Sequence, residues 1–214
     1  SEISEIDIQF NGTGGVGQGA IGTLVDTGMQ HDYYTFKCEA GSMTIKKMNI
    51  ASEYCDLKLL IYGDSISEPE SYFPTNDFNN AWTQLVINNV KGYAISSGRG
   101  GTTIYQVLTR IQNELPYIKA KYVMVTIGTN GGNTYENLSQ LVRIILNNGA
   151  IPILNNIPCN ESGTQVSENA LIEQVRADFG LKGCRFDVAT SLGTDGLTVD
   201  TSKMWWENYS DAYN

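Results

Sequence analysis

The stretch Leu57-Lys58-Leu59-Leu60-Ile61-Tyr62-Gly63-Asp64-Ser65 decides the fold of this chain. Its apolar run ends abruptly in a glycine, an aspartate and a serine. This pattern is typical of a buried parallel strand that delivers polar side chains to the carboxyl edge of a sheet. Ligands of open α/β sheets bind at that edge. Ser65 is therefore the candidate nucleophile.

After residue 57, apolar runs alternate with segments of helical periodicity. Strands are predicted at residues 57–62, 92–95, 122–127, 151–154 and 185–189. Helices are predicted at residues 79–89, 104–111, 138–145 and 171–179, and Asn133 with Glu136 has the spacing of a capping box. Such alternation implies right-handed crossovers and a parallel sheet. The predicted fold class is α/β: a three-layer α/β/α sandwich around a flavodoxin-like five-stranded parallel sheet, spanning residues 56–214.

Residues 1–55 have a different sequence pattern. Apolar and polar residues alternate around Ile6, Tyr34 and Met43, which predicts antiparallel β structure. We interpret the segment as a small β-rich appendage, or as the remnant of a β-sandwich domain. The segment Gly17-Gln-Gly19-Ala-Ile-Gly22 matches GxGxxG, but it lacks the flanking strand and helix of a dinucleotide site. A flexible loop is the better interpretation.

Composition excludes several classes of function. The formal net charge of -9 disfavours nucleic acid as a partner, because binding it depends on neutralising phosphates. No apolar run is long enough to predict a membrane span, and a signal peptide is expected to be absent or already removed. With no CxxC pair and a single histidine, His31, neither a metal site nor a cofactor is predicted. The pairing of Cys38, Cys55, Cys159 and Cys184 stays open between disulfides and free thiols.

Three predicted strands are followed by loops that carry polar or glycine-rich sequence. These loops are Gly63-Asp64-Ser65, Ser97-Gly98-Arg99-Gly100-Gly101 and Gly128-Thr129-Asn130-Gly131-Gly132. Glycines let the backbone approach a ligand and expose its N–H groups, and an asparagine side chain adds an amide donor. A serine hydroxyl with converging N–H donors is the equipment for acyl transfer, because the donors stabilise the developing oxyanion.

The three loops in this order resemble the SGNH/GDSL hydrolase family of esterases and lipases, over roughly residues 57–214. Gly63-Asp64-Ser65 matches the family's first block, Ser97-Gly98-Arg99 its second and Gly128-Thr129-Asn130 its third. The resemblance implies that Ser65 is the nucleophile. It also implies an oxyanion hole built from the Ser65 N–H, the Gly98 N–H and the Asn130 side chain, with Gly100 as the alternative second donor.

The family's last block is an aspartate followed three or four residues later by a histidine. Asp211 matches the aspartate, but the chain stops at Asn214 without the histidine. Either the chain ends just before that histidine, or Asn214 replaces it. Asp195 opens an alternative block with a threonine in the place of histidine, and His31 is interpreted as a structural or surface residue. Serine needs an adjacent base, so this exact polypeptide is expected to be nearly inactive.

The resemblance implies a serine esterase, and two features favour O-acetyl groups on carbohydrate. One is the β-rich segment before the hydrolase domain; the other is the Ser-Gly-Arg block, which is similar to that of rhamnogalacturonan acetylesterase-like members. The alternatives are a non-catalytic carbohydrate-binding or virion surface module, and a lipase or thioesterase of the same fold. Export from the cell is expected, and the oligomeric state is open. Arg99 is interpreted as a solvated side chain or a contact for an acidic substrate. Five aromatic residues are interpreted as core packing or as a wall on which sugars stack: Tyr72, Phe73, Trp82, Trp205 and Trp206.

Overall fold

The computed structural model describes residues 3–13, 42–52, 56–68, 81–91, 94–116 and 118–203. The chain divides into two compact units, Ser1–Cys55 and Asp56–Asn214. In the first unit, β1 (Ile3–Thr13) pairs antiparallel with β2 (Ser42–Ser52), and the register shifts between Gln9 and Phe10. The antiparallel β structure predicted around Ile6 and Met43 is present, whereas the predicted run at residues 34–38 lies outside the described residues.

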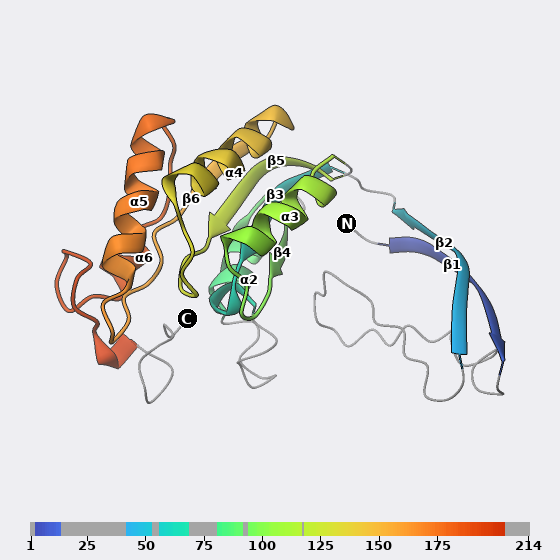
Figure 1. The fold of residues 1–214 in the computed structure, drawn as a ribbon, viewed down its shortest axis with the longest axis horizontal. Coiled ribbons are helices and arrows are strands. Elements are labelled where there is room, and N and C mark those ends of the chain that lie inside the picture. The colour runs from blue at the N-terminus through green and yellow to red at the C-terminus, as the bar shows by residue number, and fades with distance from the viewer. Residues whose placement is uncertain are drawn as a thin grey trace. The chain divides into compact units, whose positions relative to one another are not determined.

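The second unit contains a four-stranded sheet whose pairings are all parallel. Its strands are β3 (Asp56–Gly63), β4 (Ala94–Gly98), β5 (Lys119–Thr126) and β6 (Ile151–Leu154). The strand order β4-β3-β5-β6 places the first strand of the unit between the second and the third (Figure 1). This is the start of the flavodoxin-like order, as predicted.

The helices follow the predicted apolar stripes. They are α2 (Trp82–Asn89), α3 (Ile104–Glu114), α4 (Tyr135–Asn147), α5 (Gln165–Asp178) and the short α6 (Phe186–Ala189), with single 3₁₀ turns η1 (Ser65–Ser67) and η3 (Thr201–Lys203). The cap predicted at Asn133 is wrong by one residue. Thr134 caps α4 by accepting a hydrogen bond from the Asn137 N–H at 3.1 Å. Within the described ranges, no helix combines the length and the apolar character needed to cross a bilayer.

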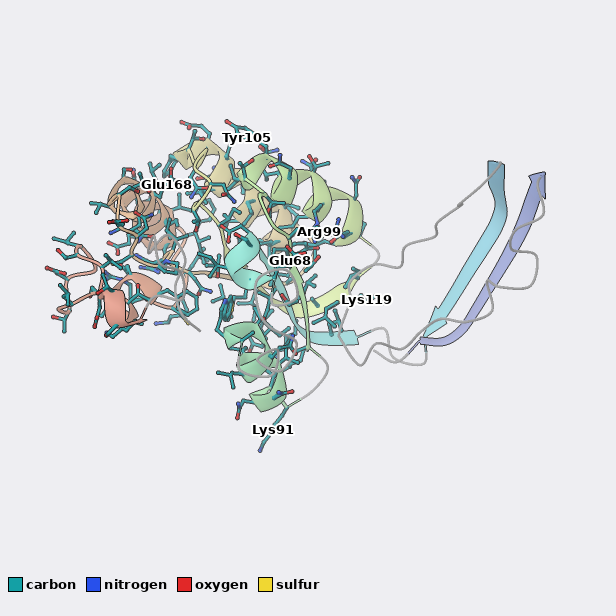
Figure 2. All side chains as sticks on the ribbon, turned by 90° about the horizontal axis from the view of Figure 1, so that it is seen from below. Glu68, Lys91, Arg99, Tyr105, Lys119 and Glu168 are labelled. Atoms are coloured by element: carbon teal, nitrogen blue, oxygen red, sulfur yellow. The ribbon has the colours of Figure 1, made fainter. Side chains whose placement is uncertain are left out.

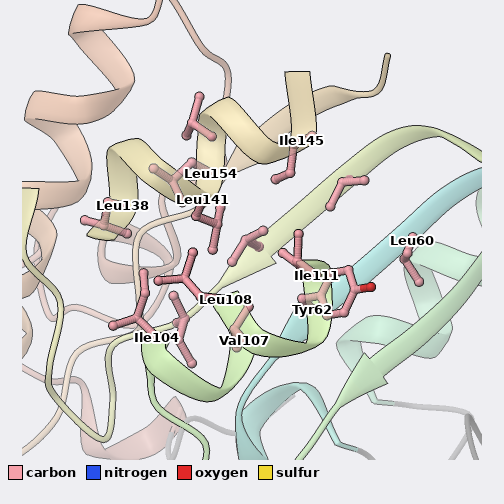
Figure 3. Packing of buried hydrophobic residues seen from close by; sticks show 14 of the residues in the cluster. Leu60, Tyr62, Ile104, Val107, Leu108, Ile111, Leu138, Leu141, Ile145 and Leu154 are labelled. Atoms are coloured by element: carbon pink, nitrogen blue, oxygen red, sulfur yellow. The ribbon is translucent and has the colours of Figure 1, made fainter. Parts of the chain in front are cut away.

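Both faces of the sheet are buried, which makes the three layers. Leu60 and Tyr62 of β3 pack with apolar side chains of α3, α4 and α5 (Figure 3). The alternate β3 residues, Leu59 and Ile61, pack on the opposite face with Ile87 of α2. Successive strand residues point to opposite faces, so a continuous apolar run such as 57–62 is what a doubly covered strand requires.

The predicted fifth strand at residues 185–189 is wrong, because Arg185 makes only an isolated bridge with Asn156 and residues 186–189 form the helix α6. The residues just before them do reach the sheet. Leu154 N–H donates to the Lys182 carbonyl at 3.0 Å, and Asn156 N–H donates to the Cys184 carbonyl at 2.9 Å. These are isolated parallel bridges beyond β6, too short to make a strand. A short apolar run does not separate a strand from a helix by periodicity alone.

Candidate active site

The ends of three neighbouring strands lie at the same level of the sheet. Gly63, the last residue of β3, is paired with Gly98 of β4 and with Thr126 of β5. All pairings are parallel, so the chain leaves each strand at the same edge. The three glycine-containing loops singled out in the sequence therefore open side by side at the carboxyl edge of the sheet, where ligands of this architecture bind.

Ser65 lies in a tightly bonded turn directly after β3. It is the half-buried first residue of η1, and its carbonyl accepts a hydrogen bond from the Glu68 N–H at 3.1 Å. Asp64 is buried, and its Oδ1 accepts from the Ile66 N–H at 3.1 Å. The Trp82 indole of α2 donates to the Ile66 carbonyl at 3.0 Å. These bonds hold the backbone that presents the serine, and Trp82 is a packing residue as well as a support for this turn.

The glycine-rich loop after β4 approaches that turn closely. A β-carbon on Gly98 would lie 2.4 Å from the Ser67 carbonyl oxygen, and one on Gly63 would lie 2.2 Å from the Ser67 Oγ. Real β-carbons essentially never come so near, so both positions require glycine. The Ser96 hydroxyl also donates to the Ser67 carbonyl at 3.0 Å. Ser67, three positions after Asp64, is thus the residue against which both glycines pack.

The two candidate backbone donors of this loop differ in what they already bind. The Gly100 N–H donates to the Glu68 carboxylate, which lies on the turn after β3, next to the loop that carries Arg99 (Figure 2). Within the described residues, the Gly98 N–H makes a long contact of 3.4 Å with the Ser96 Oγ. A long hydrogen bond is weak and easily exchanged. The geometry therefore favours Gly98 over Gly100 as the donor available to a ligand.

Asn130 is exposed in the loop after β5, as a ligand-facing amide must be. Its Nδ2 donates to the Thr102 carbonyl at 2.9 Å. An asparagine amide has two N–H groups, so this bond fixes the orientation of the side chain and leaves a second donor. A tight turn, closed by Gly131 N–H to Gly128 carbonyl at 2.8 Å, shapes the loop; Gly131 has φ +72° and Gly132 φ +88°, conformations that favour glycine.

The side chains of Asn133 and Glu168 lie against the backbone of the same loop. The Asn133 amide donates to the Ile127 carbonyl at 3.0 Å. A β-carbon on Gly128 would lie 2.6 Å from Asn133 Nδ2 and 3.3 Å from Glu168 Oε2 of α5, so both side chains touch the backbone here. Burial raises the pKa of the Glu168 carboxyl, and hydrogen bonding from Asn133 opposes the rise. This carboxyl therefore lies beside the backbone of the loop that carries Asn130.

Thr102 touches all three loops. Its hydroxyl lies 3.1 Å from the Gly63 carbonyl and 2.8 Å from the Arg99 carbonyl, and its own carbonyl accepts the Asn130 amide. Sequence reasoning missed Thr102, Glu68 and Ser96. Glu68 and Ser96 flank recognised motifs and could have been examined on that ground. Thr102 precedes a helix and reads as an ordinary capping residue, because its partners come from distant parts of the chain.

Of the remaining candidate residues, the structure describes Asp195, Cys159 and Cys184. Asp195 lies in an exposed turn in which its Oδ1 accepts from the Leu197 N–H at 3.0 Å, the ordinary use of an aspartate in a turn. Cys159 and Cys184 are free thiols, Cys159 buried and Cys184 exposed. The other predicted residues lie outside the described part of the chain: His31, Cys38, Cys55, Tyr72, Phe73, Trp205, Trp206 and Asp211.

No family model matches the sequence, and no curated protein matches it. Solved structures do match its fold. TesA superposes with a TM-score of 0.57 at 20% identity, over 72% of this chain and 88% of TesA. A GDSL-like lipase from Bacteroides thetaiotaomicron gives 0.55 at 14% identity, over 74% and 80%. AlinE4, an SGNH-hydrolase family esterase, gives 0.54 at 15% identity, over 73% and 90%.

These similarities define the class of fold first: a parallel α/β sheet with flanking helices. More particularly, the chain has the fold shared by GDSL and SGNH hydrolases. The fold that the three sequence blocks predicted by resemblance is thereby confirmed.

Proposed function

We propose that this chain is a serine ester hydrolase that forms an acyl-enzyme on Ser65. The observation that carries the proposal is the strand register, which sets Gly63 level with Gly98 and with Thr126. It brings a serine-bearing turn, a glycine N–H and an asparagine amide to one edge of the sheet. A nucleophile with convergent N–H donors is the arrangement that acyl transfer requires.

The reaction would proceed in two steps. The Ser65 Oγ attacks the ester carbonyl carbon and gives its proton to the base, which would be the histidine that the family's last block places after Asp211. The carbonyl oxygen becomes an oxyanion that accepts from the Ser65 N–H, the Gly98 N–H and the Asn130 amide. The C–O bond to the leaving alcohol then breaks, and the base returns its proton to that alcohol. Water attacks the acyl-enzyme by the same route, which releases the acid and restores the serine.

We assign Asp211 to the orientation of the base, a role that the family resemblance suggests. An aspartate in this position holds the base in the productive tautomer and stabilises its charged form. Asp211 lies outside the described residues, so the proposal for it depends on the sequence block alone. The only histidine of the sequence, His31, belongs to the other unit.

For the substrate we propose O-acetyl groups on carbohydrate. Support comes from the Ser97-Gly98-Arg99 form of the second block and from the β-rich segment that precedes the α/β unit. Arg99 lies at the carboxyl edge, one residue after the proposed donor Gly98, and its backbone N–H donates to the Gly63 carbonyl at 3.1 Å. This position would allow its side chain to contact a polar or acidic sugar.

The test is ester hydrolysis by the full-length protein, which here means a form that carries the histidine of the family's last block after Asp211, measured with p-nitrophenyl acetate and with acetylated polysaccharides. Ser65→Ala is expected to lower kcat at least about a thousandfold, because the nucleophile is lost. Ser162→Ala, an exposed serine outside the three loops, is the matched control and should retain wild-type rates. Hydrolysis that persists in Ser65→Ala would refute the proposal. Faster turnover of long-chain esters than of acetyl esters would favour a lipase, and polysaccharide binding without acetate release would favour a binding module.

A further inference from the structure

We propose that Thr102 is the positioning residue of the oxyanion hole. This inference rests on the proposed ester-hydrolase function and deepens it. Thr102 is buried, 9% exposed, between the glycine-rich loop and α3. Its role would be to hold the Gly98 and Asn130 donors at a fixed place relative to Ser65.

The Thr102 hydroxyl joins two of the site's segments. Its Oγ1 lies 3.1 Å from the carbonyl of Gly63, which ends β3 just before the nucleophile turn, and 2.8 Å from the carbonyl of Arg99, which follows the donor Gly98. A hydroxyl has one hydrogen, so the two carbonyls share it. The Arg99 N–H donates to the same Gly63 carbonyl at 3.1 Å, which closes a small bonded ring between the two segments.

The Thr102 main chain reaches the third segment. Its carbonyl accepts the Asn130 amide at 2.9 Å, and this is the bond that orients the proposed side-chain donor. A displacement of Thr102 would therefore move the Asn130 amide and the Arg99 carbonyl together. Oxyanion stabilisation depends on donors that are already in place before reaction, so small displacements of the donors lower kcat more than they weaken substrate binding.

Helix capping does not account for this threonine. The N-cap of α3 is Thr103, whose N–H donates to Gln106 Oε1 at 2.8 Å in a capping box. The Thr102 hydroxyl bonds in the other direction, to the end of β3, 39 residues earlier in the chain. The two carbonyl partners come from different segments, which indicates that this buried hydroxyl holds those segments in position. Capping α3 would not require them.

The experiment compares Thr102→Val, which keeps the shape and removes the hydroxyl, with Thr102→Ser, which keeps the hydroxyl. The matched control is Thr190→Val. Thr190 is equally buried, at 8% exposed, and lies outside the three loops. Its Oγ1 also bonds backbone groups: it donates to the Phe186 carbonyl at 2.8 Å, lies 3.4 Å from the Asp187 carbonyl and accepts from the Cys159 N–H at 2.9 Å. Each variant of the full-length protein is measured for kcat and KM on p-nitrophenyl acetate and for its melting temperature, beside Ser65→Ala.

We expect Thr102→Val to lose about tenfold in kcat, equivalent to about 1.4 kcal/mol, with KM changed by less than about twofold. Thr102→Ser should restore most of kcat. Thr190→Val should lower the melting temperature by about as much as Thr102→Val does, without lowering kcat. A Thr102→Val kcat within about twofold of wild type would overturn the proposal, and so would an equal loss of kcat in Thr190→Val. If Thr102→Val does not fold, Thr102→Cys replaces it; its weak S–H donor should give an intermediate kcat, and a kcat equal to that of Thr102→Ser would overturn the proposal.

A second readout separates this inference from the proposed function. If Ser65→Ala shows that the protein is not a serine esterase, amide hydrogen exchange still tests what Thr102 holds. Exchange of the Arg99 amide should become about tenfold faster in Thr102→Val and stay unchanged in Thr190→Val. Unchanged exchange in Thr102→Val would refute the positioning role whatever the activity of the protein.

Discussion

Gly98 lies directly against the main chain of Ser67, so close that a β-carbon on Gly98 would sit 2.4 Å from the Ser67 carbonyl oxygen. This relationship couples the nucleophile turn to the loop of the proposed backbone donor. Ser67 belongs to the same 3₁₀ turn as Ser65, the proposed nucleophile, and Gly98 carries the N–H proposed as the donor. The distance between the proposed nucleophile and the proposed donor is thus fixed by backbone packing rather than by flexible side chains.

The first prediction concerns this contact. Gly98→Ala should force the two segments apart, lower kcat on p-nitrophenyl acetate by at least about a hundredfold and destabilise the protein by about 1–3 kcal/mol. Gly193→Ala is the control, because a β-carbon there would have only the Asp195 Oδ1 nearby, at 3.9 Å. Thermal unfolding and steady-state kinetics measure both effects, and a Gly98→Ala variant with normal kcat would contradict the coupling.

The second prediction concerns the side-chain donor. Asn130→Ala should lower kcat by about 10²–10³-fold with little change in KM, because an oxyanion donor acts mainly in the transition state. Asn148→Ala is the matched control; Asn148 donates to the Ile144 carbonyl at the end of α4 and should be dispensable for activity. A rise in KM with unchanged kcat would show that Asn130 binds the substrate rather than the oxyanion.

The third prediction concerns the Gly100 N–H, which already donates to Glu68. The Glu68 carboxylate accepts from the Gly100 N–H, so Glu68→Gln should keep this bond through its amide oxygen and Glu68→Ala should lose it. Two-dimensional ¹H–¹⁵N NMR reports the Gly100 amide directly. Its proton resonance should move upfield strongly in Glu68→Ala and less in Glu68→Gln. No change in either variant would mean that Gly100 is not held by Glu68, and Gly100 would then return as a candidate donor.

The fourth prediction follows from the buried carboxyl of Glu168. Burial raises its pKa in the folded protein, so the folded state binds more protons than the unfolded state above the ordinary glutamate value of about 4.3. Its contribution therefore lowers the free energy of unfolding as pH rises from that value through the raised pKa. Glu168→Gln removes this loss of unfolding free energy. The amide of the new side chain can also donate to Asn133 Oδ1, which has no hydrogen-bond partner within the described residues.

Glu168→Gln should accordingly raise the melting temperature by about 2–4 °C at pH 7, and by less at pH 4. Melting curves across this range measure the effect, with the exposed Glu161→Gln as the control substitution. Equal shifts at both pH values, or a loss of stability at pH 7, would contradict the assignment of a raised pKa to Glu168.

Much of the fold could be predicted because burial imposes a pattern on the sequence. The run that ends at Gly63 has to be apolar on both faces, and α3 and α4 show the apolar stripe of helices that cover a sheet. The prediction for residues 185–189 is wrong because five residues are too few for periodicity to decide. The cap of α4 was misplaced because Asn133 bonds the Ile127 carbonyl, leaving Thr134 to cap the helix.

The site could be predicted only in part, for a related reason. Ser65, Gly98 and Asn130 lie at or just after strand ends, and their residue types alone suggest the roles proposed for them. Thr102 acts through the Gly63 carbonyl and the Asn130 amide, contacts between residues separated by 39 and 28 positions. No local pattern encodes such contacts, since they exist only once the strand order is known. The Glu68–Gly100 bond is of the same kind.

Covalent labelling tests the central claim, that Ser65 is the nucleophile, most directly. The full-length protein is mixed with p-nitrophenyl acetate, quenched in acid during turnover, digested and analysed by peptide mass spectrometry. We predict one acetyl group on the peptide that contains Ser65, and none on the same peptide of Ser65→Ala. Hydrolysis with the acetyl group on another residue, or with the same adduct formed in Ser65→Ala, would contradict the account.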